Sequence, residues 1–338
     1  SIINKEISYR ALVEKGFQDA RKVILPRLDQ LRKQLSPEVT ALFSDDLCLS
    51  KRQMMRLVNI YKDIILSERF LAELGDISSE EYFLNFIVNN FFISKYQFNE
   101  DIFREAKVPN KEQKVIVEEV QNLLEAYLSY LNVPMKPLHV LFVPKDMANI
   151  KNGRHFSFSN VLVMPDLNPY NKKERDALFF SILQEGLRMN SIGFSERMLD
   201  LGASFYLAAK LFKYYRKDQR TMSEFLDDLL EEEIIMITMG EKKAIRSVEF
   251  IVGEIGEEQI ACHYFSGDER IFFKTIGSEK WLESLFAIEQ ALNVKEHTLG
   301  DAMAQLGKIE NIIKEIFGSN PHRFSYEITR PTHLLKYG

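Results

Sequence analysis

Helical periodicity dominates the first third of the chain. Apolar residues recur at helical spacing, at Ala11, Val13, Phe17, Ala20, Val23 and Ile24. Pro26 perturbs the pattern because its ring removes a backbone donor and crowds the preceding turn, and the helix resumes to Leu35. The tripeptide Ser-Pro-Glu at 36–38 restarts a helix, with serine as N-cap and proline in the first turn. Further helices are predicted at 51–74, after a capping signal at Ser50, at 79–92 and at 111–131.

The pattern changes near Pro134. Residues 138–144 are a short apolar run that ends at a proline, and residues 156–165 alternate and then become apolar, which predicts two or three strands of a small sheet. The next segments again have helical spacing, at 172–189, 195–217, 223–236, 242–255 and 281–292. The sequence therefore predicts an α+β, predominantly helical fold. We expect an all-α N-terminal domain over 1–110, followed by a mixed domain with a small β-sheet over 111–338.

Composition narrows the class of protein. The chain has 338 residues, of which 46% are hydrophobic, so it can fill real cores. A net charge of -5 lacks the basic excess of a nucleic-acid binder. Cys48 and Cys262 are too few for a disulfide framework, and we interpret both as reduced core residues. No apolar run reaches the roughly 18 residues of a membrane span, so a soluble chain is expected. A cytoplasmic location is favoured, and a signal or anchor removed from upstream of Ser1 stays open.

Three phrases in the second half carry a family resemblance. Residues 183–188 read Leu-Gln-Glu-Gly-Leu-Arg, 200–208 read Asp-Leu-Gly-Ala-Ser-Phe-Tyr-Leu-Ala, and 264–268 read Tyr-Phe-Ser-Gly-Asp. With the preceding strands, this order resembles the gluzincin-type zincin metallopeptidases over about residues 135–295. In that family, two histidines one turn apart in H-E-x-x-H bind zinc, and the glutamate between them activates the metal-bound water. A glutamate on the following helix is the third ligand.

The departures from the family pattern fall on the metal ligands. The resemblance puts Gln184 and Arg188 at the two histidine positions, Leu201 at the ligand glutamate and Glu185 at the general base. A glutamine carbonyl is a poor zinc ligand, leucine cannot coordinate, and arginine brings a fixed positive charge. The resemblance therefore implies a degenerate, non-catalytic site with no metal and no cofactor. Because Glu185 and Arg188 are three residues apart on one helix, we expect them to pair.

The resemblance also implies a binding groove. Zincins hold extended substrates along an edge strand, expected here at 155–160 or its neighbour. The predicted ligand is a protein or peptide of unspecified identity, and the predicted partner-binding residues are His155, Phe156, Phe158, Arg188 and Tyr206. Neither nucleic acid nor a membrane span is expected, and the sequence does not specify the oligomeric state.

Several alternatives stay open. Glu185 and Arg188 are an ordinary surface ion pair if the domain is an unrelated α+β fold. The chain is an active metal-dependent hydrolase if Glu185 works with ligands that the motif does not identify, although no two histidines stand three or four residues apart. It is a helical docking scaffold if the second domain is purely structural. The acidic run at 227–233 is interpreted as a solvated helix face.

Overall fold

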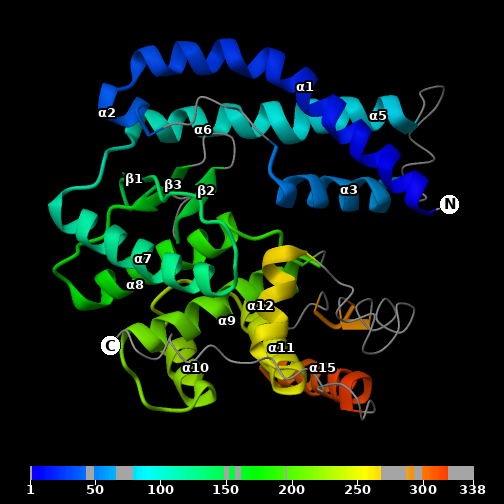
Figure 1. Ribbon diagram of the computed structural model, residues 1–338, viewed down its shortest axis with the longest axis vertical. Coiled ribbons are helices and arrows are strands. Elements are labelled where there is room, and N and C mark those ends of the chain that lie inside the picture. The colour runs from blue at the N-terminus through cyan, green and yellow to red at the C-terminus, as the bar shows by residue number, and fades with distance from the viewer. Residues whose placement is uncertain are drawn as a thin grey trace. The chain divides into compact units, whose positions relative to one another are not determined.

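Helices dominate the described part of the chain, which also contains one small sheet (Figure 1). The computed structural model describes residues 2–42, 49–65, 79–147, 152–156, 161–194, 196–267, 287–288, 290–292 and 299–318. The predicted α+β, predominantly helical class is confirmed for these residues.

The chain packs as two units. Unit 1 comprises Ser1–Gln113 and Leu138–Asp166, and unit 2 comprises Lys114–Pro137 and Leu167–Gly338. Packing thus groups the sheet with the N-terminal helices, whereas the sequence-based division at 110/111 groups it with the later helices. As a statement about independent domains, that division stays a prediction.

Unit 1 is built on one long helix. Its helices are α1 (Ile2–Gln34), α2 (Pro37–Thr40), α3 (Lys51–Ile65), α5 (Ser79–Phe86), the π-helix η1 (Ile87–Ile93) and α6 (Ser94–Glu105). Helix α1 continues through Pro26, contrary to the expected perturbation. Proline has no backbone N–H, so the backbone carbonyl of Lys22, one turn earlier, receives no hydrogen bond from residue 26. Both residues are exposed, so water can donate to that carbonyl instead.

Both capping predictions in unit 1 are confirmed. The Ser36 hydroxyl accepts a 3.3 Å hydrogen bond from the backbone of Val39, at the start of α2. At α3, the Ser50 hydroxyl accepts from the backbone of Gln53 at 3.1 Å, and the Gln53 side chain accepts from the backbone of Ser50 at 3.0 Å. These reciprocal bonds satisfy amide groups that the helix itself leaves unpaired.

The sheet has three strands in the order β1-β3-β2: β1 (Val140–Val143), β2 (Arg154–Phe156) and β3 (Val161–Pro165). Strands β1 and β3 are parallel, and β2 is antiparallel to β3. Every residue of β1 and β3 is buried, which explains why both read as continuous apolar runs. Lys107 forms an antiparallel bridge to Phe142. Among the described residues, β1 and β2 are therefore the two outer strands, and the Lys107 bridge lies on the open side of β1.

The regular elements described in unit 2 are all helices. It contains most of α7 (Lys111–Tyr130), together with α8 (Lys172–Met189), α9 (Arg197–Tyr215), α10 (Met222–Glu231), α11 (Met239–Ile255), α12 (Glu257–Ser266) and α15 (Leu299–Gly318). Helix α10 is shorter than the predicted 223–236, because the chain turns after Glu231 and Glu233 takes a positive φ of 47°. No described helix is long and apolar enough to cross a membrane.

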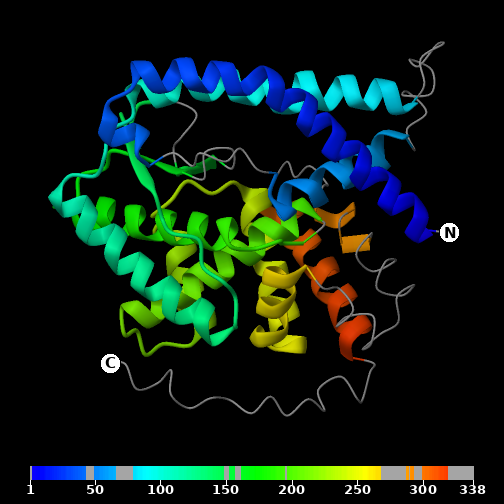
Figure 2. The ribbon, with the colours of Figure 1, turned by 45° about the horizontal axis from the view of Figure 1, so that its top comes forward.

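A close approach between two helices organises unit 2. Helix α11 packs against both α9 and α15 (Figures 1 and 2). At Gly202 of α9, an added Cβ atom would lie 2.5 Å from the backbone oxygen of Ala244 on α11. Only glycine leaves room for this contact. The glycine within the phrase at 200–208 therefore sets the distance between α9 and α11.

Candidate functional site

Helices α8 and α9 form an antiparallel pair that positions the candidate site. Asp176, early in α8, pairs with Arg216 at the end of α9, whereas Gln184, two turns later, bonds to Ser204. Later residues of α8 thus contact earlier residues of α9, as expected for an antiparallel pair. The Asn171 side chain caps the start of α8. The four degenerate metal-site positions lie on these two helices, with Gln184, Glu185 and Arg188 on α8 and Leu201 on α9.

Glu185 and Arg188 are paired, as expected from their spacing. The Arg188 guanidinium Nη1 donates to Glu185 Oε1 at 3.2 Å. The two side chains are 12% and 25% exposed for Glu185 and Arg188, so the pair is largely shielded from solvent. Glu185 raises the pKa of Arg188, burial opposes this, and Asp200 and Tyr264 raise the pKa further. Arg188 therefore stays cationic, with carboxylates of both helices near it.

Asp200 supplies the second negative charge near Arg188. Its side chain is buried, and its Oδ1 accepts a 3.1 Å hydrogen bond from the backbone of Phe194. This bond ties the connection between the two helices to the first turn of α9. Asp200 begins the phrase at 200–208, but no role was predicted for it from the sequence. One signal in the sequence could have identified it. Residues 184 and 188 are four apart on one helix, and residues 204 and 200 are four apart on the next, so an antiparallel packing that joins 184 to 204 also brings 188 near 200.

Gln184 is engaged by α9. Its Nε2 donates to the Oγ of Ser204 at 3.1 Å, and that hydroxyl donates to the backbone oxygen of Leu201 at 2.8 Å. Ser204 is fully buried, and Leu201 is half-buried. Sequence reasoning missed Ser204, although a small polar residue inside an apolar helix usually signals a hydrogen bond.

The residues at the implied ligand positions do not fit zinc. Gln184 is hydrogen-bonded to Ser204, Arg188 is a cation paired with Glu185, and Leu201 has no donor atom. Zinc is held by imidazole, thiolate or carboxylate groups. Elsewhere within the described residues, no group of three or more His, Cys, Asp or Glu side chains could hold a metal ion.

The predicted partner-binding residues fall in both units. In unit 2, Arg188 is partly exposed, whereas Tyr206 is only 4% exposed. The pKa of the Tyr206 phenol is raised, first by burial and then by Glu257 and Glu249. In unit 1, His155 and Phe156 lie in strand β2. Phe158 lies outside the described residues.

Helix α12 corrects one cysteine prediction. Cys262 is a free cysteine on the exposed side of α12, so its interpretation as a core residue is wrong. Its neighbours Ala261 and His263 turn inward, and the His263 ring lies 4.2 Å from the ring of Phe194. Helix α12 buries the face that carries Ala261 and His263, and Cys262 lies on its opposite, exposed face. Cys48 lies outside the described residues.

Comparisons with known proteins give no family for the chain. A scan against family models finds no match, and searches of curated proteins and of solved structures find none either.

Proposed function

We propose that this chain is a non-catalytic relative of the zincin metallopeptidases that binds a protein or peptide partner at the degenerate site around Glu185 and Arg188. The observation that carries the proposal is the shielded ion pair between these two residues, 3.2 Å apart at positions matching the general base and the second histidine. A guanidinium there supplies a positive charge without the open coordination that hydrolysis requires.

The energetics of the pair support a retained role. An exposed pair three residues apart on a helix stabilises by only about 0.2–0.5 kcal/mol. Here both side chains are mostly shielded and Asp200 adds a second carboxylate, so removing the cation leaves negative charge poorly solvated. A partner that completes the desolvation of this pair would gain specificity from it, because mismatched charge at such a position is strongly unfavourable.

Metal content is the first test. The purified protein is incubated with excess zinc, freed of loosely bound ions and measured by elemental analysis. We expect no retained zinc. One tightly held zinc per chain with chelator-sensitive hydrolysis would contradict the proposal and favour an active hydrolase with other ligands.

Partner binding requires its own test. A photo-crosslinking amino acid is placed at the half-buried Leu201, and as a control at the exposed Ala304 of α15. We expect a crosslinked partner from the first position only, lost when Arg188→Glu reverses the local charge. Equal crosslinking from both positions would argue against a binding site here. Truncation at about residue 110 gives two halves for a binding assay. We expect the C-terminal half to retain the partner, and retention by the N-terminal half alone would favour the helical docking scaffold.

The ancestry is tested by restoring the ligands. The triple variant Gln184→His, Arg188→His, Leu201→Glu should gain zinc binding if the two helices keep the metallopeptidase geometry. The double variant without the Leu201 change is the matched control, with weaker binding because one ligand is missing. No zinc binding by a folded triple variant would count against the zincin relationship.

A further inference from the structure

Exposed tyrosines and lysines gather at the other end of α8 and α9. We define the tyrosine–lysine patch by the following six residues: Tyr170, Lys172, Lys173, Tyr214, Tyr215 and Lys217. The tyrosine side chains are 79%, 48% and 39% exposed in chain order. All three lysines are exposed as well. Exposed aromatic residues in such a group are typical of protein-binding surfaces.

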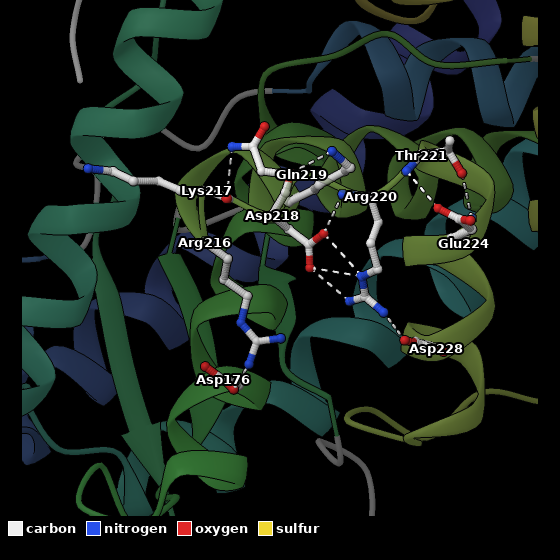
Figure 3. Close-up of polar contacts among 10 residues, drawn as sticks. Asp176, Arg216, Lys217, Asp218, Gln219, Arg220, Thr221, Glu224 and Asp228 are labelled. Carbon is white, nitrogen blue, oxygen red and sulfur yellow. Dashed lines mark hydrogen bonds and ion pairs between the residues drawn. The ribbon is translucent and has the colours of Figure 1, made fainter.

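Two interhelical contacts hold the patch together. Arg216 of α9 pairs with Asp176 of α8, one turn after Lys172 (Figure 3). The ring of Tyr215 stacks on Phe179 of α8, with 4.2 Å between centroids. The first turns of α8 and the last turn of α9 therefore present their side chains from one rigid support.

The turn after α9 fixes the direction of Lys217. Its backbone takes a positive φ of 54° and donates to the oxygen of Tyr214 at 3.0 Å. The side chain of Lys213 donates to the backbone oxygen of Asp218 at 2.7 Å, closing the turn. Figure 3 shows the Lys217 side chain extending away from the neighbouring hydrogen-bonded cluster. The amine thus points away from the carboxylates of its own turn, and the residue is exposed.

The carboxylates around the patch are already engaged. Asp176 pairs with Arg216, and Asp218 and Asp228 pair with Arg220. Glu119 accepts one hydrogen bond from the Tyr215 hydroxyl and forms an ion pair with Arg175. Glu174 accepts from the backbone of Asn168. In the described part of the chain, Lys172, Lys173 and Lys217 make no ion pair. Their positive charges are therefore not neutralised by ion pairs among the described residues, although the whole chain carries -5.

We propose that the tyrosine–lysine patch binds an acidic segment of a partner protein. The lysines attract and orient negative side chains, which raises the rate of association, and the tyrosines supply contact area with few rotamers to immobilise. A nucleic-acid binder typically makes about six or more contacts to phosphates. Three lysines are too few for that number of contacts. Lys172 of the patch lies about 24 Å along α8 from Arg188, at a rise of about 1.5 Å per residue. The patch is therefore a second surface and does not depend on the degenerate site.

The test uses a defined probe. A fluorescently labelled peptide of alternating glutamate and alanine, flanked by leucines, is titrated with the full chain and followed by anisotropy. We expect saturable binding that weakens with added salt, and at least tenfold weaker binding in the variant Lys172→Glu, Lys173→Glu, Lys217→Glu. The tenfold value corresponds to three exposed ion pairs of typical strength. The same peptide with lysine in place of glutamate should not bind.

A matched control separates the patch from general charge effects. Lys308 on α15 is also exposed, so Lys308→Glu makes the same charge change as Lys173→Glu away from the patch. Lys173→Glu should weaken peptide binding at least about twofold, its share of the three ion pairs, while Lys308→Glu should leave the affinity unchanged. The proposal would be overturned by equal effects of the two variants or by a complete lack of peptide binding. It would also be overturned if oligothymidylate bound more tightly than the peptide through the same lysines. Circular dichroism melts verify that every variant is folded.

Discussion

Gln184 on α8 and Ser204 on α9 are joined by a 3.1 Å hydrogen bond, with the amide Nε2 donating to the hydroxyl oxygen. The same hydroxyl donates to the backbone of Leu201. Gln184 and Leu201, which the proposed relationship assigns to metal-ligand positions, are therefore connected through one buried serine. Hydrogen bonds and charged groups link α8 to α9 at these positions.

This connection predicts a measurable coupling between the two residues. Ser204→Ala should lower the free energy of unfolding by about 0.5–1.5 kcal/mol, the usual contribution of a hydrogen bond. In a Gln184→Met background the same change should matter less, because the amide donor is already gone. Urea denaturation of the wild type, both single variants and the double variant measures the difference. Strict additivity would show that the bond contributes nothing.

Gly202 predicts a larger packing effect. Gly202→Ala should destabilise the protein by about 1–3 kcal/mol, since its Cβ would overlap the backbone of Ala244 and force α9 and α11 apart. The matched control is Gly253→Ala on α11, where an added Cβ meets nothing within 4 Å. That change should stabilise by about 0.5–1 kcal/mol through helix propensity alone. Thermal melts of the two variants should therefore shift in opposite directions.

Arg188 is predicted to stabilise the charges around it. Arg188→Met should lower stability by about 1–3 kcal/mol at neutral pH, between the values for exposed and fully buried pairs. Adding Glu185→Gln should recover part of the loss, because it removes one of the carboxylates left without a counter-charge. Lys314→Met breaks the more exposed pair with Glu310 and should change the melting temperature little. A larger effect at Lys314 than at Arg188 would contradict the argument from burial.

The turn after α9 predicts a specific pH dependence. Hydrogen bonds from Arg220 lower the pKa of Asp218 to about 2, from its side chain first and then its backbone (Figure 3). A lowered pKa means that the charged form stabilises the fold. That contribution is complete above the unfolded-state value of about 3.9 and is lost as the pH falls through about 2. NMR titration of the carboxyl carbon should give this midpoint, and Arg220→Met should move it upward. An unchanged midpoint would exclude Arg220 as the cause.

Local signals explain what could be predicted about the candidate site. Glu185 and Arg188 lie on one helix, so their spacing alone predicted the 3.2 Å ion pair. The partner of Gln184 could not be found in this way, because Ser204 is 20 residues away on another helix. Asp200 was missed for the same reason. Its approach to Arg188 depends on the antiparallel packing of α8 and α9.

The sequence by itself determined the helices, their caps and the short apolar strands, because these depend on residues within a few positions of one another. The capping box at Ser50 and Gln53 is one such local device. Tertiary structure alone decided that β1 and β3 pack with the N-terminal helices, that Cys262 faces solvent and that Gly202 sets the spacing of α9 and α11. These features depend on which distant surfaces meet, and the free energy of burial that selects those surfaces is a property of the whole chain.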